Sequence, residues 1–230
     1  MKKHWSLLVA STLILGALTG CDDEGSTAPT PGTDSHNISM SISTRSSLGK
    51  GTNAVEIQSA KILLKNIAFH RFPSDNDVDV KVGPFVVTLD PSGSVNTVAV
   101  SNIPAGIYDR VAFRLHKPED SEPVPDAEFR EGESGDQRYS VILSGTFNGQ
   151  AFVYKSRQNG KQEIPLAPPI SVDEKGTTNV TLTVDVNSWF VRDGQPLDPT
   201  DDQNAQAIDD NIKASFATIF KDDNKDGRPD

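Results

Sequence analysis

The sequence predicts a mainly β protein, an antiparallel β-sandwich followed by one C-terminal α-helix. Three observations favour this fold class. Apolar and polar residues alternate along many short segments, which is typical of half-buried strands. Turn residues such as Asn148-Gly149 separate these segments. Only one segment, near the C-terminus, repeats its apolar residues at helical spacing.

The strands are expected in order between residues 37 and 195. Isoleucine and methionine alternate with serine over 38–43, which defines the first strand. A turn signal at 90–93 separates the third strand from the fourth, and Asn148-Gly149 closes a later hairpin. The stretch over 55–72 is long enough for two strands or one bent strand. The expected strands cover residues 38–43, 55–72, 84–89, 95–100, 107–115, 139–147, 151–154 and 180–186.

One helix is expected near the end of the chain, covering an edge or end of the sandwich. Asp209 and Asp210 lie toward its start and Lys221 at its end, an arrangement that suits the helix dipole. Its apolar residues recur at spacings of three to four: Ile208, Ile212, Phe216 and either Ile219 or Phe220.

The chain divides into four parts. Residues 1–20 are expected to be a signal peptide, and residues 21–36 a cysteine followed by a flexible tether without large apolar residues. Residues 37–195 form the expected sandwich, which carries an acidic insertion at 117–137. Residues 196–230 hold the helix and an acidic tail.

Composition excludes several classes of protein. The 230 residues include 22 Lys and Arg against 32 Asp and Glu, a formal net charge of −10. This acidic balance disfavours nucleic acid as a partner, because an acidic surface repels phosphate. The chain has one cysteine, so it cannot form an intramolecular disulfide framework.

The N-terminal residues indicate export. Lys2 and Lys3 precede an apolar run over 7–18, which is too short to span a bilayer and right for a signal peptide. The following Leu18-Thr19-Gly20-Cys21 resembles the lipobox of bacterial lipoproteins. That resemblance implies cleavage before Cys21, acylation of Cys21 and attachment to a membrane of the bacterial cell envelope. The alternative is an ordinary signal peptide with a coincidental cysteine.

The acidic residues after Cys21 leave the membrane undecided. In enterobacterial lipoproteins, an aspartate in the place of Asp22 resembles an inner-membrane retention signal. In some other phyla, an acidic run such as Asp22-Asp23-Glu24 resembles a surface-export signal. The expected location is therefore the cell envelope, on the periplasmic face or the cell surface.

The C-terminal nine residues read D-x-N-x-D-G-x-x-D and resemble the short calcium loops of dockerin and thrombospondin type 3 repeats. Oxygen ligands at alternate positions of a tight loop suit Ca²⁺, and Gly227 permits the sharp turn. The chain ends before the position of the bidentate glutamate of an EF-hand. The alternative is a solvated acidic tail. The candidate ligands are Asp222, Asn224, Asp226 and Asp230.

Two further features have competing interpretations. The insertion at 117–137 holds eight acidic residues, and it is either a functional loop or, as we favour, a solvated connection. Tyr108, Tyr139, Tyr154 and Trp189 could stack against sugars, but core packing at the sheet ends is the simpler interpretation.

A segment of the predicted sandwich also resembles a known family. Asn102-Ile103-Pro104-Ala105-Gly106-Ile107-Tyr108 forms a turn that enters an alternating strand, and it is similar to transthyretin-like (prealbumin-like) sandwich domains. It is also similar to a bacterial lipoprotein domain family of unknown function. The resemblance covers residues 38–116 and implies an Ig-like or prealbumin-like fold in the cell envelope, with no catalytic residues to carry over.

These observations predict a lipid-anchored envelope lipoprotein that acts as a non-enzymatic binding or structural module, with Ca²⁺ as a possible stabilising ion. One alternative is a surface lipoprotein that binds glycans, and another is an envelope hydrolase. The sequence contains no H-E-x-x-H, G-x-S-x-G or P-loop motif. The expected partners are the membrane, through the lipid, and a protein or glycan.

Overall fold

The computed structural model describes residues 36–45, 54–132, 137–216 and 218–230. Ser35–Asp230 form a compact unit, and the fold given below is that of this unit alone. The predicted signal peptide, Cys21 and all of the predicted tether except His36 lie outside the described residues.

Twelve strands make up most of the described chain. The longest, β2, spans 18 residues. The strands are β1 (Ile38–Thr44), β2 (Val55–Phe72), β3 (Asn76–Leu89), β4 (Asn96–Ser101), β5 (Gly106–Leu115), β6 (Val141–Phe147), β7 (Gln150–Ser156), β8 (Gly160–Val172), β9 (Thr178–Val184), β10 (Val191–Arg192), β11 (Gln195–Pro196) and β12 (Thr218–Lys221). The helical elements are α1 (Ala205–Ala214) and the short 3₁₀ turns η1 (Ala127–Arg130), η3 (Val186–Ser188) and η4 (Asp202–Asn204).

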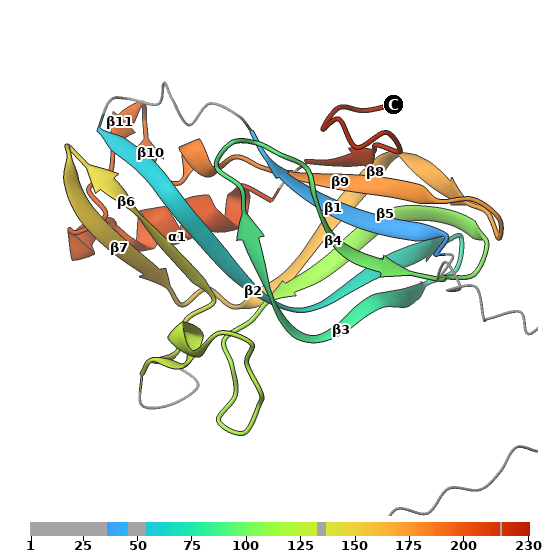
Figure 1. Ribbon diagram of the computed structural model, residues 1–230, viewed down its shortest axis with the longest axis horizontal. Coiled ribbons are helices and arrows are strands. Elements are labelled where there is room, and N and C mark those ends of the chain that lie inside the picture. The colour runs from blue at the N-terminus through green and yellow to red at the C-terminus, as the bar shows by residue number, and fades with distance from the viewer. Residues whose placement is uncertain (1–35, 46–53, 133–136, 217) are drawn as a thin grey trace, which may run out of the picture. The chain divides into compact units, whose positions relative to one another are not determined.

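The strands form two main sheets, and the predicted mainly β class with one C-terminal helix is confirmed (Figure 1). One sheet has the order β12-β9-β1-β4. The other has the order β7-β6-β2-β5-β8, with β3 on the remaining edge of β2. Every pairing is antiparallel except that of β1 with β9, which is parallel over Ile38–Thr44 and Thr178–Val184.

One apolar core lies between the two sheets. Alternate residues of the strands face it, as the period of two predicts. Tyr108 and Trp189 are its largest side chains, and both are fully buried. The core includes Ile38, Met40 and Ile42 of β1, Val180, Leu182 and Val184 of β9, Ile62, Ile67 and Phe69 of β2, and Val111 and Phe113 of β5.

The helix is shorter than the sequence predicts. Helix α1 ends at Ala214 and buries Ile208 and Ile212 against the core, whereas Thr218–Lys221 form β12 and pair with β9. Ile219 is buried as part of β12. The apolar residues that share a helical spacing therefore belong to two different elements, α1 and β12. The free edge of β9 supplies backbone hydrogen bonds to β12, and this pairing outweighs the helical periodicity. The four-stranded sheet therefore extends past residue 195, where the predicted sandwich range ends.

Strand β2 pairs with two strands, β6 and β5, one after the other along the same edge. It pairs with β6 over Val55–Ile62 and with β5 from Leu64 onward, while β3 lies along its other edge. At the junction, the Leu63 N–H donates to the Ser140 carbonyl and the Leu63 carbonyl accepts from His116 N–H. The acidic insertion leaves and re-enters the sheet at this fork, below β2 in Figure 1.

Candidate functional site

A shallow depression lies on the outer face of the six-stranded sheet, opposite the core. Ala68 of β2 and Ala112 of β5 are cross-strand partners that line it, and their short side chains leave space between longer neighbours. Each of these alanines is 2% exposed, and Asn66 lies beside them. The volume is about 250 Å³, which suits a small polar molecule better than a drug-sized ligand.

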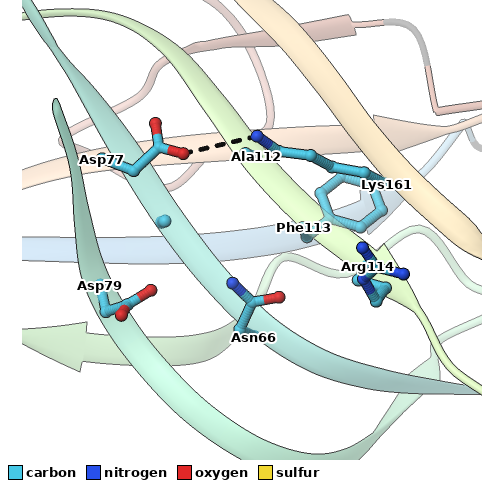
Figure 2. Close-up of a pocket in the computed structure, with 8 residues that line it drawn as sticks. Asn66, Asp77, Asp79, Ala112, Phe113, Arg114 and Lys161 are labelled. Atoms are coloured by element: carbon cyan, nitrogen blue, oxygen red, sulfur yellow. Dashed lines mark hydrogen bonds and ion pairs between the residues drawn. The ribbon is translucent and has the colours of Figure 1, made fainter. Parts of the chain in front are cut away.

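The walls of this depression carry opposite charges (Figure 2). Asp77 and Asp79 of β3 stand on one side, and Arg114 of β5 and Lys161 of β8 stand on the other. The Lys161 ammonium donates to Glu163 at 2.6 Å and reaches Asp77 at 3.4 Å. The hydrogen bond between Lys161 and Glu163 raises the pKa of the lysine and lowers the pKa of the glutamate, so both stay charged near neutral pH. A small ligand with a positive and a negative end would meet complementary charge on both walls.

His70 lies two residues along β2 from Ala68, on the same face. Its Nδ1 is 2.9 Å from Asp109 Oδ1, and its Nε2 is 3.1 Å from Asp75 Oδ1. The hydrogen bond with Asp75, supported by that with Asp109 and opposed by burial, raises the pKa of the imidazole above 6.5. Within the described chain, His70 has no Ser, Thr or Cys side chain as a hydrogen-bond partner. Its ring therefore bridges the β2–β3 turn to β5.

The acidic insertion is held against the sheet by ion pairs. Lys61 of β2 donates to Asp126 at 2.6 Å and to Glu128 at 2.7 Å. The hydrogen bonds to these carboxylates raise the pKa of Lys61, and the bond from Lys61 lowers the pKa of Asp126. The other pairs join Glu119 and Glu122 to Lys65, Asp120 to Arg138, Glu122 to His116, and Glu131 to Lys155.

An apolar contact adds to these ion pairs. Phe129 of η1 is fully buried and packs against Leu63 of β2 and Ile142 of β6, in a cluster separate from the main core. Five of the six described acids of the insertion pair with residues of the sheet, and Asp120 pairs with Arg138 just before β6. Residues 117–132 therefore lie against the outer face, while four of the acids, Glu119, Asp120, Glu128 and Glu131, keep more than half of their side-chain surface exposed to solvent. Glu133 and Asp136, its two remaining acids, lie outside the described residues.

The acidic tail covers the outer face of the other sheet. Asp222 is fully buried, and its carboxylate accepts from the Thr181 hydroxyl at 2.6 Å and from the N–H groups of Asp226 at 3.0 Å and Gly227 at 3.1 Å. Asn179 adds hydrogen bonds to the backbone of Asp222. Ser39 and Ser41 of β1 donate to Asn179 beneath the tail. This polar face is therefore buried and hydrogen-bonded.

The predicted calcium ligands lie in this tail. Asp222, Asn224 and Asp226 occupy one hydrogen-bonded loop, whereas the Asp230 carboxylate accepts from Lys221 Nζ at 2.9 Å and from the Asp223 N–H at 2.9 Å. Within residues 36–45, 54–132, 137–216 and 218–230, no group of three or more His, Cys, Asp or Glu side chains is arranged to hold a metal. Calcium binding stays a prediction from the sequence.

The aromatic residues do not form an exposed platform. Tyr108 and Trp189 are fully buried, and Tyr154 is 8% exposed with its hydroxyl donating to the Ala205 carbonyl and Asp209. Burial raises the pKa of the Tyr154 hydroxyl, and the nearby Asp209 charge adds to this shift. Tyr139 lies under the cations of Lys155 and Arg157. The core interpretation is confirmed for Tyr108, Tyr154 and Trp189.

Comparisons with known proteins leave the chain without a family. No protein family matches it, and neither the curated proteins nor the solved structures contain a significant match. The resemblances to lipoproteins and to prealbumin-like domains remain predictions. None of the helices in the described part of the chain has the length and apolar character to cross a membrane. Cys21, the predicted lipidation site, lies outside the described residues.

Sequence reasoning missed the depression at Ala68 and Ala112. Both positions fit the outward side of a strand pattern, but the sequence does not show that β2 and β5 are neighbours or which residues face each other. The charged residues that form the walls come from β3, β5 and β8, which are separated along the chain. The sequence offers one signal for such a depression, which is an alanine on the outward side of a strand with charged residues on either side of it.

Proposed function

We propose that this chain is a lipid-anchored lipoprotein of the bacterial cell envelope whose β-sandwich is a non-enzymatic binding module. The observation that carries the proposal is the place of Cys21. The only cysteine of the chain directly follows an apolar run of signal-peptide length and ends Leu18-Thr19-Gly20-Cys21. Acyl chains on Cys21 would supply the attachment, at about 0.8 kcal/mol for each buried CH₂ group.

The binding site that we propose is the depression at Ala68 and Ala112. Its opposed carboxylates and cations favour a small zwitterion, such as a free amino acid, whose ammonium faces Asp77 and Asp79 and whose carboxylate faces Arg114. Burial of Tyr108, Tyr154 and Trp189 leaves little support for stacking against sugars. The hydrogen bonds of His70 to two carboxylates support a binding role over acid–base catalysis.

The anchor is tested by replacing its cysteine. The full chain, expressed in a bacterium with labelled palmitate, is expected to carry the label and to sediment with membranes. Cys21→Ser is expected to lose both properties, while the matched control Ser26→Ala in the same segment keeps them. Label and membrane association that persist in Cys21→Ser would contradict the proposal.

The site is tested by filling it. NMR titration of the full chain with glycine is expected to shift resonances of Asn66, Asp77 and Arg114. Ala112→Leu is expected to abolish these shifts, because its added side chain occupies the depression. Ala151→Leu, at an exposed alanine on β7, is the matched control and should leave them unchanged. Shifts with glucose and none with glycine would favour the glycan alternative and overturn the zwitterion assignment.

A further inference from the structure

Exposed apolar side chains gather at one end of the sandwich. Five large apolar residues of the described chain are exposed, and three of them, Phe72, Val100 and Ile107, lie near this end. Phe72 ends β2 and is the direct cross-strand partner of Ile107 in β5, so their side chains share one face. Phe72 is 52% and Ile107 47% exposed.

Two exposed prolines extend this surface. Pro73 follows Phe72, and Pro104 precedes β5. We call the surface of Phe72, Pro73, Pro104 and Ile107 the apolar tip. The Tyr108 hydroxyl donates to the Pro104 carbonyl at 2.7 Å, and Phe72 pairs with Ile107 across β2 and β5, so both sides of the tip are restrained by contacts with the fold. A preformed apolar surface loses little conformational entropy when it meets a partner.

The apolar tip adjoins the point where the predicted tether meets the fold. Asn37 bonds to both the backbone N–H and the carbonyl of Ile103, at 2.9 and 2.8 Å, and its own N–H donates to Asn102. The Arg71 guanidinium donates to the Ala105 carbonyl at 2.9 Å and so connects this turn to the end of β2. The start of β1, the end of β4 and the start of β5 lie together at the right of Figure 1.

The length of the predicted tether limits how far this end can lie from a membrane. Residues 22–36 separate Cys21 from Asn37, and this segment reaches at most about 58 Å when fully extended. As a random coil of Gly-Ser-like stiffness it would span roughly 20 Å. A chain anchored at Cys21 would thus hold the apolar tip within reach of the bilayer surface.

We propose that the apolar tip docks on the lipid–water interface of the membrane that carries the Cys21 anchor. This inference rests on the proposed function, because the anchor provides the high local concentration that lets a small apolar surface bind. Phe72 and Ile107 would enter the headgroup region, where burial of apolar surface is favourable. Since the contact is apolar and the protein is acidic, zwitterionic lipids suffice as the docking surface.

Tryptophan fluorescence tests this orientation. The chain has two tryptophans, Trp5 in the predicted signal peptide and the fully buried Trp189. We would add Phe72→Trp to a full chain carrying Trp5→Phe and reconstitute it through Cys21 into phosphatidylcholine vesicles. The matched control is Val153→Trp, at a residue that is 62% exposed on β7 of the same sheet.

Lipids brominated near the headgroup are expected to quench the fluorescence of Phe72→Trp and to leave that of Val153→Trp unchanged. Adding Ile107→Ser should restore part of the lost fluorescence. Equal quenching of both variants, or quenching of neither, would overturn the inference. A mass spectrum that shows unmodified Cys21 would overturn the proposed anchor instead. The quenching of Phe72→Trp and Val153→Trp would then be compared after the Cys21 thiol is coupled to a maleimide lipid. This comparison tests whether the apolar tip contacts the membrane, independently of natural acylation.

Discussion

The two acidic segments of this protein cover opposite outer faces by different means. The insertion at 117–132 lies on the six-stranded sheet through ion pairs that are partly open to solvent, as between Lys61 and Asp126, whose side chains are 24% and 26% exposed. The tail at 222–230 lies on the four-stranded sheet through Asp222, which is fully buried and accepts three hydrogen bonds. Segments of similar composition are thus attached differently: the acids of the insertion pair with cations at the surface beside the buried Phe129, whereas the tail is attached through one buried, hydrogen-bonded carboxylate.

This difference determines how much each contact contributes to stability. Exposed ion pairs contribute about 0–1 kcal/mol each and weaken in salt. A buried carboxylate contributes little net stability by itself, but its removal leaves donors without partners at a cost of about 1–3 kcal/mol each. The tail is therefore the more sensitive of the two covers, and the predictions below run from the largest effect to the smallest.

Removal of the Asp222 carboxylate is expected to have the largest effect. Asp222→Ala leaves the Thr181 hydroxyl and two backbone N–H groups without their acceptor, and should lower the free energy of unfolding by about 3–5 kcal/mol. Urea denaturation measures the loss. Asp226→Ala, an exposed acid of the same loop, is the control and should cost no more than about 1 kcal/mol. Equal losses in the two variants would contradict the difference in burial.

Truncation of the apolar contact should come next. Phe129→Ala empties the space against Leu63 and Ile142, and should cost about 3 kcal/mol, the low end for such changes because the insertion can detach while the sandwich stays folded. Hydrogen exchange should become faster over 119–131 and stay unchanged over 222–230. Protection lost throughout the chain would show that the insertion is part of the main cooperative unit.

Loss of a surface cation should have a smaller, salt-dependent effect. Lys61→Ala removes the pairs with Asp126 and Glu128 and should cost about 1 kcal/mol at low salt. In about 1 M salt, where the screening length is roughly 3 Å, this cost should nearly vanish. The cost of Asp222→Ala should stay constant in the same series, because its partners are buried. A matching salt dependence for both variants would remove the distinction between the covers.

A fall in pH should release the insertion from the sheet. A rise in pH should weaken the bridge that His70 forms between the β2–β3 turn and β5. The pKa of Asp126 is lowered, so its contribution is present above the ordinary value of 3.8 and is lost as pH falls through the lower folded value. The pKa of His70 is raised, so its contribution is present below 6.5 and is lost as pH rises through the higher folded value. NMR should therefore show the insertion loosening as pH falls below 3.8 and the β2–β3 turn loosening as pH rises above 6.5. Loosening of both at the same end of the pH range would contradict the assignments.

Calcium should have the smallest effect on the stability of the fold. If the tail binds Ca²⁺ with the millimolar affinity of extracellular modules, 2 mM Ca²⁺ would stabilise the fold by about 0.6 kcal/mol. The Tm would rise by about 2 °C, and Asp226→Ala would not show this rise. Thermal unfolding in EDTA and in Ca²⁺ measures both. An unchanged Tm in the unsubstituted protein would leave the tail as a cover held by protein hydrogen bonds alone.

Local sequence patterns predicted the individual strands of this fold better than they predicted which strands pair with each other. The alternation over 38–43 and the Asn148-Gly149 hairpin signal are confirmed, with β1 over Ile38–Thr44 and positive φ angles at both turn residues. The helix was predicted to run too far because Ile219 fits a helical spacing and a strand alike. The parallel pairing of β1 with β9 leaves no local signal, since it joins residues far apart in sequence.

The roles of the acidic segments depended on the same missing information. Asp126 and Asp222 are both acids in polar stretches, and nothing local distinguishes one paired with Lys61 from one buried under Thr181. The depression at Ala68 and Ala112 likewise requires the register of β2 and β5. Such sites arise from contacts between distant segments, so composition and periodicity alone cannot locate them.

The parallel pairing of β1 with β9 also affects the order of folding. Strand β1 lies between β4 and β9, and its pairing with β9 joins residues 140 positions apart. When the chain is synthesised from its N-terminus, β1 therefore lacks its neighbour β9 until nearly the whole sandwich has been made. Contacts of such high sequence separation slow folding. The last fifty residues thus control when the first strand becomes stable, and a chain that stopped before β9 would leave an open sheet edge available to other chains.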